Sequence, residues 1–226
     1  MSYRISFGFE KRPLLDGDTV QRVTFDFDRD YDEPLLVHQD VGRGPNGAHA
    51  LARLRLHDTI VDALVMRLRA LPANYTGVHI RHTDYNSKYV EWLHEARDKV
   101  EGPVFVATDN RQCLADCREA FGADRIHSFA TLPEQAGEPI HWRTDREGAY
   151  ERNSDAILDL MTLVLADRYF YVELVDNIVG ARRSGFSALA ARLRERNELV
   201  KRLIGRSDPV LARLDVPRAD ADPTRP

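Results

Sequence analysis

Hydrophobic and polar positions follow two alternating patterns along the chain. Short apolar runs predict strands, and longer stretches with apolar residues three or four positions apart predict helices. The predicted strands are residues 22–28, 34–40, 75–82, 102–109, 124–130 and 168–175. The predicted helices are residues 48–70, 86–100, 110–122, 152–167 and 184–204. Residues 130–150 contain two prolines and two glycines and predict a long loop.

Strands that alternate with helices predict an α/β fold, in which helices cover both faces of a mostly parallel sheet. Ligands of such sheets bind at the carboxyl ends of the strands. We expect a short β-rich segment over residues 1–47 and a main domain over residues 48–206. Residues 207–226 end in a polar, proline-containing stretch, and we predict a disordered tail there.

Composition narrows the class of protein. The chain has 226 residues, of which 43% are hydrophobic and 30% charged, as in a folded globular protein. A net charge of -4 argues against a general nucleic-acid binder. No apolar stretch approaches the roughly 18 residues of a membrane span, and the N-terminus lacks a signal-peptide pattern. We therefore expect a cytoplasmic protein, with Cys113 and Cys117 as reduced cysteines on a helix.

The stretch "HIRHTD" (79–84) places charge at the end of a predicted strand. His79 and Arg81 share one face of that strand, because side chains alternate. An arginine at a strand's carboxyl end can clamp a phosphate with paired N–H donors. Alternatively, Arg81 bridges to Asp84 and His79 is a hydrogen-bonded core residue. Spacing alone favours this second interpretation.

Two more segments place polar groups near strand ends or helix starts. Thr108 and Asp109 follow an apolar strand, where they can bind a ribose, stabilise the turn or cap the next helix. Ser184 stands where a helix begins, and Gly185 permits close backbone approach. The exposed N–H groups and dipole of a helix start favour an anion. A simple serine N-cap explains the same residues without a ligand.

Asp159 interrupts the apolar stretch 156–167. Burying its carboxylate without a partner is costly, so either the side chain faces solvent or a donor meets it. The N1–H and N2–H groups of guanine form such a donor pair, and a nearby arginine is the other candidate. We expect no metal, because no strand-end loop carries an Asp-x-Asp pair of the kind that holds a metal on a nucleotide diphosphate.

In this order, the segments resemble the nucleotide-binding half of GDP-fucose-dependent fucosyltransferases, above all the α1,6-fucosyltransferases and the bacterial nodulation-factor fucosyltransferases. The resemblance spans residues 48–200. "GVHIRHTD" is similar to the family's G-V-H-x-R-R-T-D motif, and "VFVATDN" to its A-T-D-D strand end. "AILDLMTLVLAD" resembles its I-L-D-x-x-x-L-x-x-A-D helix, and "SGFSALA" its serine-containing loop. The first motif is fairly specific, and the others gain weight from their order and spacing.

The resemblance implies a Rossmann-like, doubly wound, mostly parallel sheet. This would be the C-terminal half of a two-domain GT-B-type glycosyltransferase with a short N-terminal extension. It also implies transfer of fucose, or a related sugar, from a GDP-sugar to a hydroxyl of a carbohydrate or glycoconjugate acceptor. The transfer would invert the anomeric centre, with no metal and no cofactor beyond the donor substrate.

Residue roles follow from the matched positions. Arg81 would bind the β-phosphate and stabilise the departing diphosphate, while His79 and Asp159 would hold the guanine. Ser184 or Ser187, with backbone N–H groups, would hold the phosphates. The expected substrate-binding residues are His79, Arg81, His82, Asp109, Asp159, Ser184, Gly185 and Ser187; the expected catalytic residues are Arg81, Asp84 and Glu91.

The chain departs from the family pattern in several places. His82 replaces the second arginine, which weakens phosphate binding or makes it pH-dependent. Tyr89 stands where the α1,6 enzymes have a glutamate base, which leaves Glu91 as the nearest carboxylate and Asp84 as the second candidate. Asn110 replaces the last aspartate of A-T-D-D.

The part before the match is short compared with the family's N-terminal acceptor domain. Residues 1–47 are either a reduced remnant of that domain, or a second chain completes the acceptor site. Three hypotheses remain open: a metal-independent transferase, a non-catalytic GDP-sugar-binding module or subunit of a split transferase, and a plain α/β scaffold. In the scaffold, the same residues would be only ion pairs and helix caps.

Overall fold

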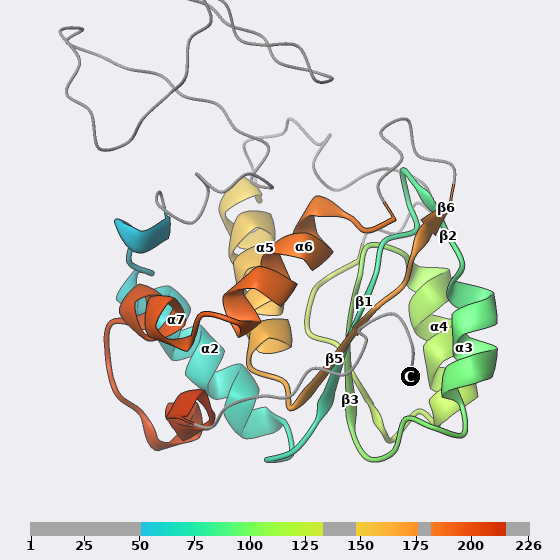
Figure 1. The fold of residues 1–226 in the computed structure, drawn as a ribbon, viewed down its shortest axis with the longest axis horizontal. Helices are drawn as coiled ribbons and strands as arrows, with labels where there is room; N and C mark the ends of the chain where they lie inside the picture. The colour runs from blue at the N-terminus through green and yellow to red at the C-terminus, as the bar shows by residue number, and fades with distance from the viewer. Residues whose placement is uncertain (1–50, 133–147, 176–181, 216–226) are drawn as a thin grey trace, which may run out of the picture.

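A computed structural model describes residues 51–132, 148–175 and 182–215 of the chain (Figure 1). Within these ranges, four parallel strands form one sheet in the order β4-β3-β1-β5. They are β1 (Thr76–Ile80), β3 (Val104–Thr108), β4 (Ile126–His127) and β5 (Arg168–Tyr171). A smaller antiparallel sheet pairs β2 (Asn86–Ser87) with β6 (Leu174–Val175).

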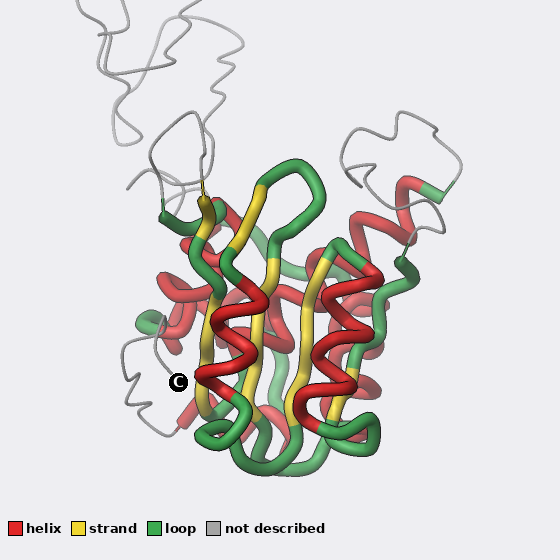
Figure 2. The backbone as a smooth tube through the Cα atoms, turned by 90° about the vertical axis from the view of Figure 1, so that its right-hand side faces the viewer, coloured by secondary structure: helices red, strands yellow, loops and turns green. Residues whose placement is uncertain are grey.

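Helices cover both faces of the main sheet (Figures 1 and 2). One face carries α3 (Tyr89–Ala96) and α4 (Arg111–Phe121), and the other carries α2 (Asp58–Ala70), α5 (Ala149–Val164) and α6 (Gly185–Arg194). The 3₁₀ helix η2 (Pro209–Asp215) packs against α2, and the helix α7 (Asn197–Ile204) packs against α6 and η2. Each face of the sheet therefore has its own hydrophobic core.

The two central strands are buried along their whole length, as expected for parallel strands covered on both faces. Gly77 of β1 pairs with Phe105 of β3 and Tyr169 of β5. A Cβ atom on Gly77 would lie 3.0 Å from the Cβ of Ala166. Glycine at this position therefore lets the end of α5 pack tightly against the sheet.

The strand order fixes where a ligand site is expected. From β1 the chain moves outward through β3 to β4, and it then crosses back to place β5 on the other side of β1. The order thus reverses between β1 and β5, and such reversals open a crevice at the carboxyl ends of the strands. The predicted α/β fold with a parallel sheet is confirmed, and its arrangement is consistent with a Rossmann-like fold.

Several predicted elements are divided in the structure. The strand predicted over 168–175 becomes β5 and β6, because its second half leaves the main sheet to pair with β2. For the same reason, the helix predicted over 86–100 begins only at Tyr89. The helix predicted over 184–204 is broken at residues 195–196 into α6 and α7.

The folded body also has different limits from those predicted. The helix predicted from residue 48 is interrupted, and α2 begins at Asp58 with His57 as its N-cap. At the other end, η2 buries Leu211 and Leu214, so a disordered tail from residue 207 is wrong for residues 209–215. The predicted strands 22–28 and 34–40, most of the loop 130–150, and residues 216–226 lie outside the described residues.

Candidate functional site

The candidate site lies at the carboxyl ends of β1 and β3, beside the first turn of α6. Arg81 directly follows β1, and Asp109 directly follows β3. The small β2–β6 sheet stands at the same end of the molecule (Figure 1). Seven of the sequence-predicted residues meet here in two adjoining hydrogen-bonded groups. One group contains Arg81, His82, Asp84 and Asp109, and the other contains His79, Ser184 and Ser187.

Arg81 is held by two carboxylates. Its Nε and Nη2 donate hydrogen bonds to Oδ1 and Oδ2 of Asp84 at 2.6 and 2.7 Å. Its Nε also lies 3.2 Å from Oδ2 of Asp109. Burial disfavours the charged guanidinium, but the hydrogen bond to Asp84 and the charge of Asp109 outweigh it and raise the pKa of Arg81. The structure thus shows the ion pair that spacing favoured.

Asp109 and Asn110 fix the backbone that follows Arg81. Oδ1 of Asp109 accepts the His82 N–H at 2.9 Å, and the Thr83 hydroxyl donates to the Asp109 carbonyl at 3.0 Å. Nδ2 of Asn110 donates to the His82 carbonyl at 2.9 Å. Asn110 also caps α4 by accepting two N–H groups. The helix cap is therefore Asn110, and Asp109 instead holds the strand-end loop.

His82 faces the small sheet and α3. Its Nδ1 accepts the N–H of Ser87 at 3.1 Å and lies 3.1 Å from the Ser87 hydroxyl. The His82 ring makes an edge contact with Tyr89, with ring centroids 4.7 Å apart. The Tyr89 hydroxyl donates to Asp116 at 2.9 Å, and burial together with this bond raises its pKa. The Tyr89 hydroxyl is therefore a hydrogen-bond donor held by α4.

A second group ties β1 to the start of α6. The His79 Nδ1 lies 2.7 Å from the Ser187 hydroxyl, and Ser184 caps α6 by accepting the Ser187 N–H at 3.0 Å. His79 stacks on Phe186 with ring centroids 4.8 Å apart. Burial, with the nearby charge of Arg81, lowers the pKa of His79 to about 3. His79 is a neutral residue that positions the first turn of α6, which begins at Gly185.

Asp159 belongs to a third cluster, between α2 and α5. Its Oδ1 accepts a hydrogen bond from Arg67 at 2.7 Å, and Arg67 also pairs with Asp155. The Arg67 guanidinium stands 5.3 Å from the ring centroid of Phe129. Burial raises the pKa of Asp159 to about 7, against the opposing effect of Arg67. Arg67 thus supplies the nearby arginine that was one of the two expected donors.

Sequence reasoning missed Arg67 and Asp155. Arg67 interrupts the apolar pattern of α2 as Asp159 interrupts that of α5, which marks each position as unusual but does not pair the two. Glu91, the other expected carboxylate, is exposed in the first turn of α3. Within the described ranges, no group of three or more His, Cys, Asp or Glu side chains could hold a metal ion.

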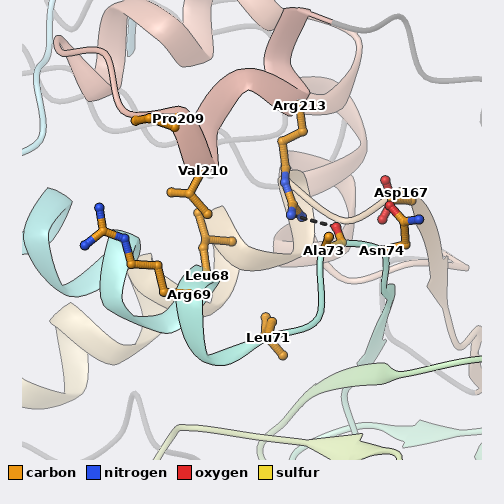
Figure 3. A pocket seen from close by; sticks show the side chains of 9 residues that line it. All are labelled: Leu68, Arg69, Leu71, Ala73, Asn74, Asp167, Pro209, Val210 and Arg213. Carbon is orange, nitrogen blue, oxygen red and sulfur yellow. Dashed lines mark hydrogen bonds between the residues drawn. The ribbon is translucent and has the colours of Figure 1, made fainter.

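A pocket lies at the opposite end of the sheet, where α2 ends and β1 and β5 begin (Figure 3). Arg213 points across it and donates to the Ala73 carbonyl at 2.7 Å. Arg69 pairs with Asp208 beside it. The pocket is lined by Leu68, Arg69, Leu71, Ala73, Asn74, Asp167, Pro209, Val210 and Arg213. None of the sequence-predicted site residues lines it.

In comparisons with protein-family models, curated proteins and solved structures, nothing matches this chain. Among the described residues, no helix is both long and apolar enough to cross a membrane.

Proposed function

We propose that this chain binds a GDP-sugar, with GDP-fucose as the first candidate, at the carboxyl ends of β1 and β3. The observation that carries the proposal is that Arg81 directly follows β1, and that β1 also binds the first turn of α6 through the hydrogen bond between His79 and Ser187. The strand order reverses beside this same strand. An arginine and a helix N-terminus are two of the groups that bind phosphates in proteins.

In this proposal, Arg81 binds the diphosphate and stabilises the charge that develops on it as the sugar leaves. The acceptor oxygen attacks the anomeric carbon, and the carbon–oxygen bond to the β-phosphate breaks with its electron pair left on GDP. The acceptor proton passes to a carboxylate, for which Asp84 and Glu91 are the candidates. The described body would be the nucleotide-binding half of a GT-B-type enzyme. Residues 1–47 or a second chain would complete the acceptor site.

A non-catalytic GDP-sugar-binding module, or a subunit of a split transferase, is the second candidate. This candidate is favoured because two side chains near the position of the family's general base are already engaged in hydrogen bonds within the chain. Tyr89 stands at the position of the family's glutamate and is bonded to Asp116, while Asp84 is engaged by Arg81. Such a protein would bind GDP-sugars without transferring the sugar unless the missing partner is added.

Isothermal titration calorimetry without metal tests nucleotide binding. GDP, GDP-fucose, GDP-mannose and UDP are titrated into the wild type, Arg81→Ala and Arg118→Ala. Arg118 is an exposed arginine in the last turn of α4 and controls for loss of charge. We expect guanine forms to bind, with roughly 10- to 100-fold weaker binding in Arg81→Ala, because charged hydrogen bonds contribute about 1.5–3 kcal/mol.

The outcome separates the hypotheses. Binding of guanine forms only, followed by sugar transfer in an acceptor screen, supports the enzyme. Binding without hydrolysis or transfer supports the module or split subunit. A folded protein that binds none of the four nucleotides refutes both and leaves the scaffold, with Arg81 and Asp84 as a structural ion pair.

A further inference from the structure

Asp84 covers one of the two edges of Arg81 that carry paired N–H donors. A guanidinium clamps a phosphate or carboxylate with two parallel N–H groups. In this structure Asp84 takes both Nε and Nη2, at 2.6 and 2.7 Å. We propose that Asp84 stands in for a phosphate on Arg81, and that an incoming diphosphate displaces it. The inference rests on the proposed role of Arg81 in phosphate binding and not on guanine or fucose.

Charge is the first reason for displacement. Arg81 faces two carboxylates, those of Asp84 and Asp109, so this group carries a net negative charge. A diphosphate that approached it without any change would meet repulsion as well as attraction. If Asp84 leaves, Arg81 and Asp109 together are neutral, and the donors given up by Asp84 pass to the phosphate.

The two carboxylates differ in how firmly they are held. Asp109 is tied to the backbone through the His82 N–H, and it stands at the end of a central strand. Its Oδ2 is buried and has no hydrogen bond within the described residues, although Nε of Arg81 lies at 3.2 Å. Asp84 lies in the loop between β1 and β2. Asp109, at the strand end, is therefore the partner that can take over Nε, and the exchange falls to Asp84 because it stands on the loop.

An internal competitor weakens ligand binding by the fraction of molecules in which the site is open. If Arg81 is open in about one molecule in ten, removing the competitor tightens binding about tenfold. A carboxylate that only shaped the site would give the opposite result, because its loss would weaken binding. The direction of the change thus distinguishes displacement from a structural role.

The test compares Asp84→Asn with wild type by calorimetric titration of inorganic pyrophosphate and of GDP. We expect about tenfold tighter pyrophosphate binding by Asp84→Asn, and loss of that gain in the double variant Arg81→Ala/Asp84→Asn. Asp116→Asn is the matched control, because it also removes one carboxylate. Asp116 lies on α4 and accepts the hydroxyl of Tyr89. Circular dichroism and melting temperature establish that each variant folds.

Salt separates direct competition from a general charge effect. At 0.5 M salt, charges beyond about 5 Å are largely screened, whereas a contact pair is screened much less. We expect the ratio of the pyrophosphate dissociation constants of wild type and Asp84→Asn to persist at high salt. Any tightening of pyrophosphate binding in Asp116→Asn should vanish. Equal gains in the two variants, or a gain that disappears with salt, would overturn the inference.

The two proposals fail in different ways. GDP binding by the wild type with no gain in Asp84→Asn would refute displacement and leave the proposed function in place. Tighter pyrophosphate binding by Asp84→Asn without GDP binding in any protein would support displacement and refute GDP-sugar binding. Absence of any anion binding in wild type and Asp84→Asn would refute both.

Discussion

The ionisation of Asp159 is the most direct test of the buried cluster between α2 and α5. Burial raises its pKa from the ordinary 3.8 to about 7, and Arg67 offsets only part of that effect. One pKa unit corresponds to about 1.4 kcal/mol, so this group alone costs up to about 4 kcal/mol of folding free energy at high pH. The cost is absent below pH 3.8, grows as the unfolded state ionises, and is complete above pH 7.

His79 acts in the opposite direction. Its pKa falls from 6.5 to about 3 on folding, so the stability it contributes is complete above pH 6.5 and is lost as pH falls towards 3. The two effects nearly cancel in the wild type between pH 4 and 6.5. The effect of Asp159 therefore has to be read from the difference between wild type and Asp159→Asn, in which the contribution of His79 is common.

Urea unfolding at half-unit intervals from pH 4.5 to 8 measures that difference. As the pH rises over this range, we expect the unfolding free energy of the wild type to fall by about 3–4 kcal/mol relative to that of Asp159→Asn. Asp155→Asn is a useful companion, because the charge of Asp155 helps to raise the pKa of Asp159. In Asp155→Asn the loss should be smaller and complete at a lower pH, because only the folded-state pKa of Asp159 falls while the unfolded-state pKa that sets its onset is unchanged. A flat difference for Asp159→Asn would refute the reasoning, since it would mean that Asp159 stays ionised beside Arg67 throughout.

Two further predictions concern the packing of α5. Arg194 is buried and donates to four carbonyl groups at the end of that helix, so Arg194→Met should cost about 3 kcal/mol of unfolding free energy. Arg194→Lys should recover less than half of this, because an ammonium cannot reproduce the guanidinium fork; full recovery would contradict the role. Gly77→Ala should cost about 1–3 kcal/mol through overpacking. Adding Ala166→Gly should restore most of that loss, because Ala166 supplies the nearest atom at 3.0 Å, and a failure to do so would locate the strain elsewhere.

The sequence predicts the helices and strands of the main sheet because each has its own hydrophobic period. It does not predict where an apolar run changes partner. Residues 169–175 are apolar except for Glu173, yet the end of this stretch pairs with Asn86 and Ser87, which lie far away in the chain. The sequence also does not predict the break between α6 and α7, because residues 195–196 include neither proline nor glycine.

The same limit applies to the site. The ion pair of Arg81 and Asp84 is local, with the two residues three positions apart in the chain, and it could be proposed from spacing. The partner of Asp159 is 92 residues away, and no pattern within α5 points to Arg67 in particular. Asn110 shows a third case: the pattern placed a cap at the end of β3, but only backbone geometry decides which of two neighbouring polar residues provides it.

The two interpretations of "HIRHTD", an ion pair and a phosphate clamp, are compatible in this structure. His79 is neutral, and Arg81 is the charged residue that follows it at the end of β1. The carboxylates of Asp84 and Asp109 both lie beside Arg81. Asp109 stands beside Arg81 at the end of a central strand, with its Oδ2 3.2 Å from Nε. In the displacement proposed above, an anionic ligand replaces Asp84, which stands on the loop after β1. The same arginine would then serve as an ion pair without the ligand and as a clamp with it.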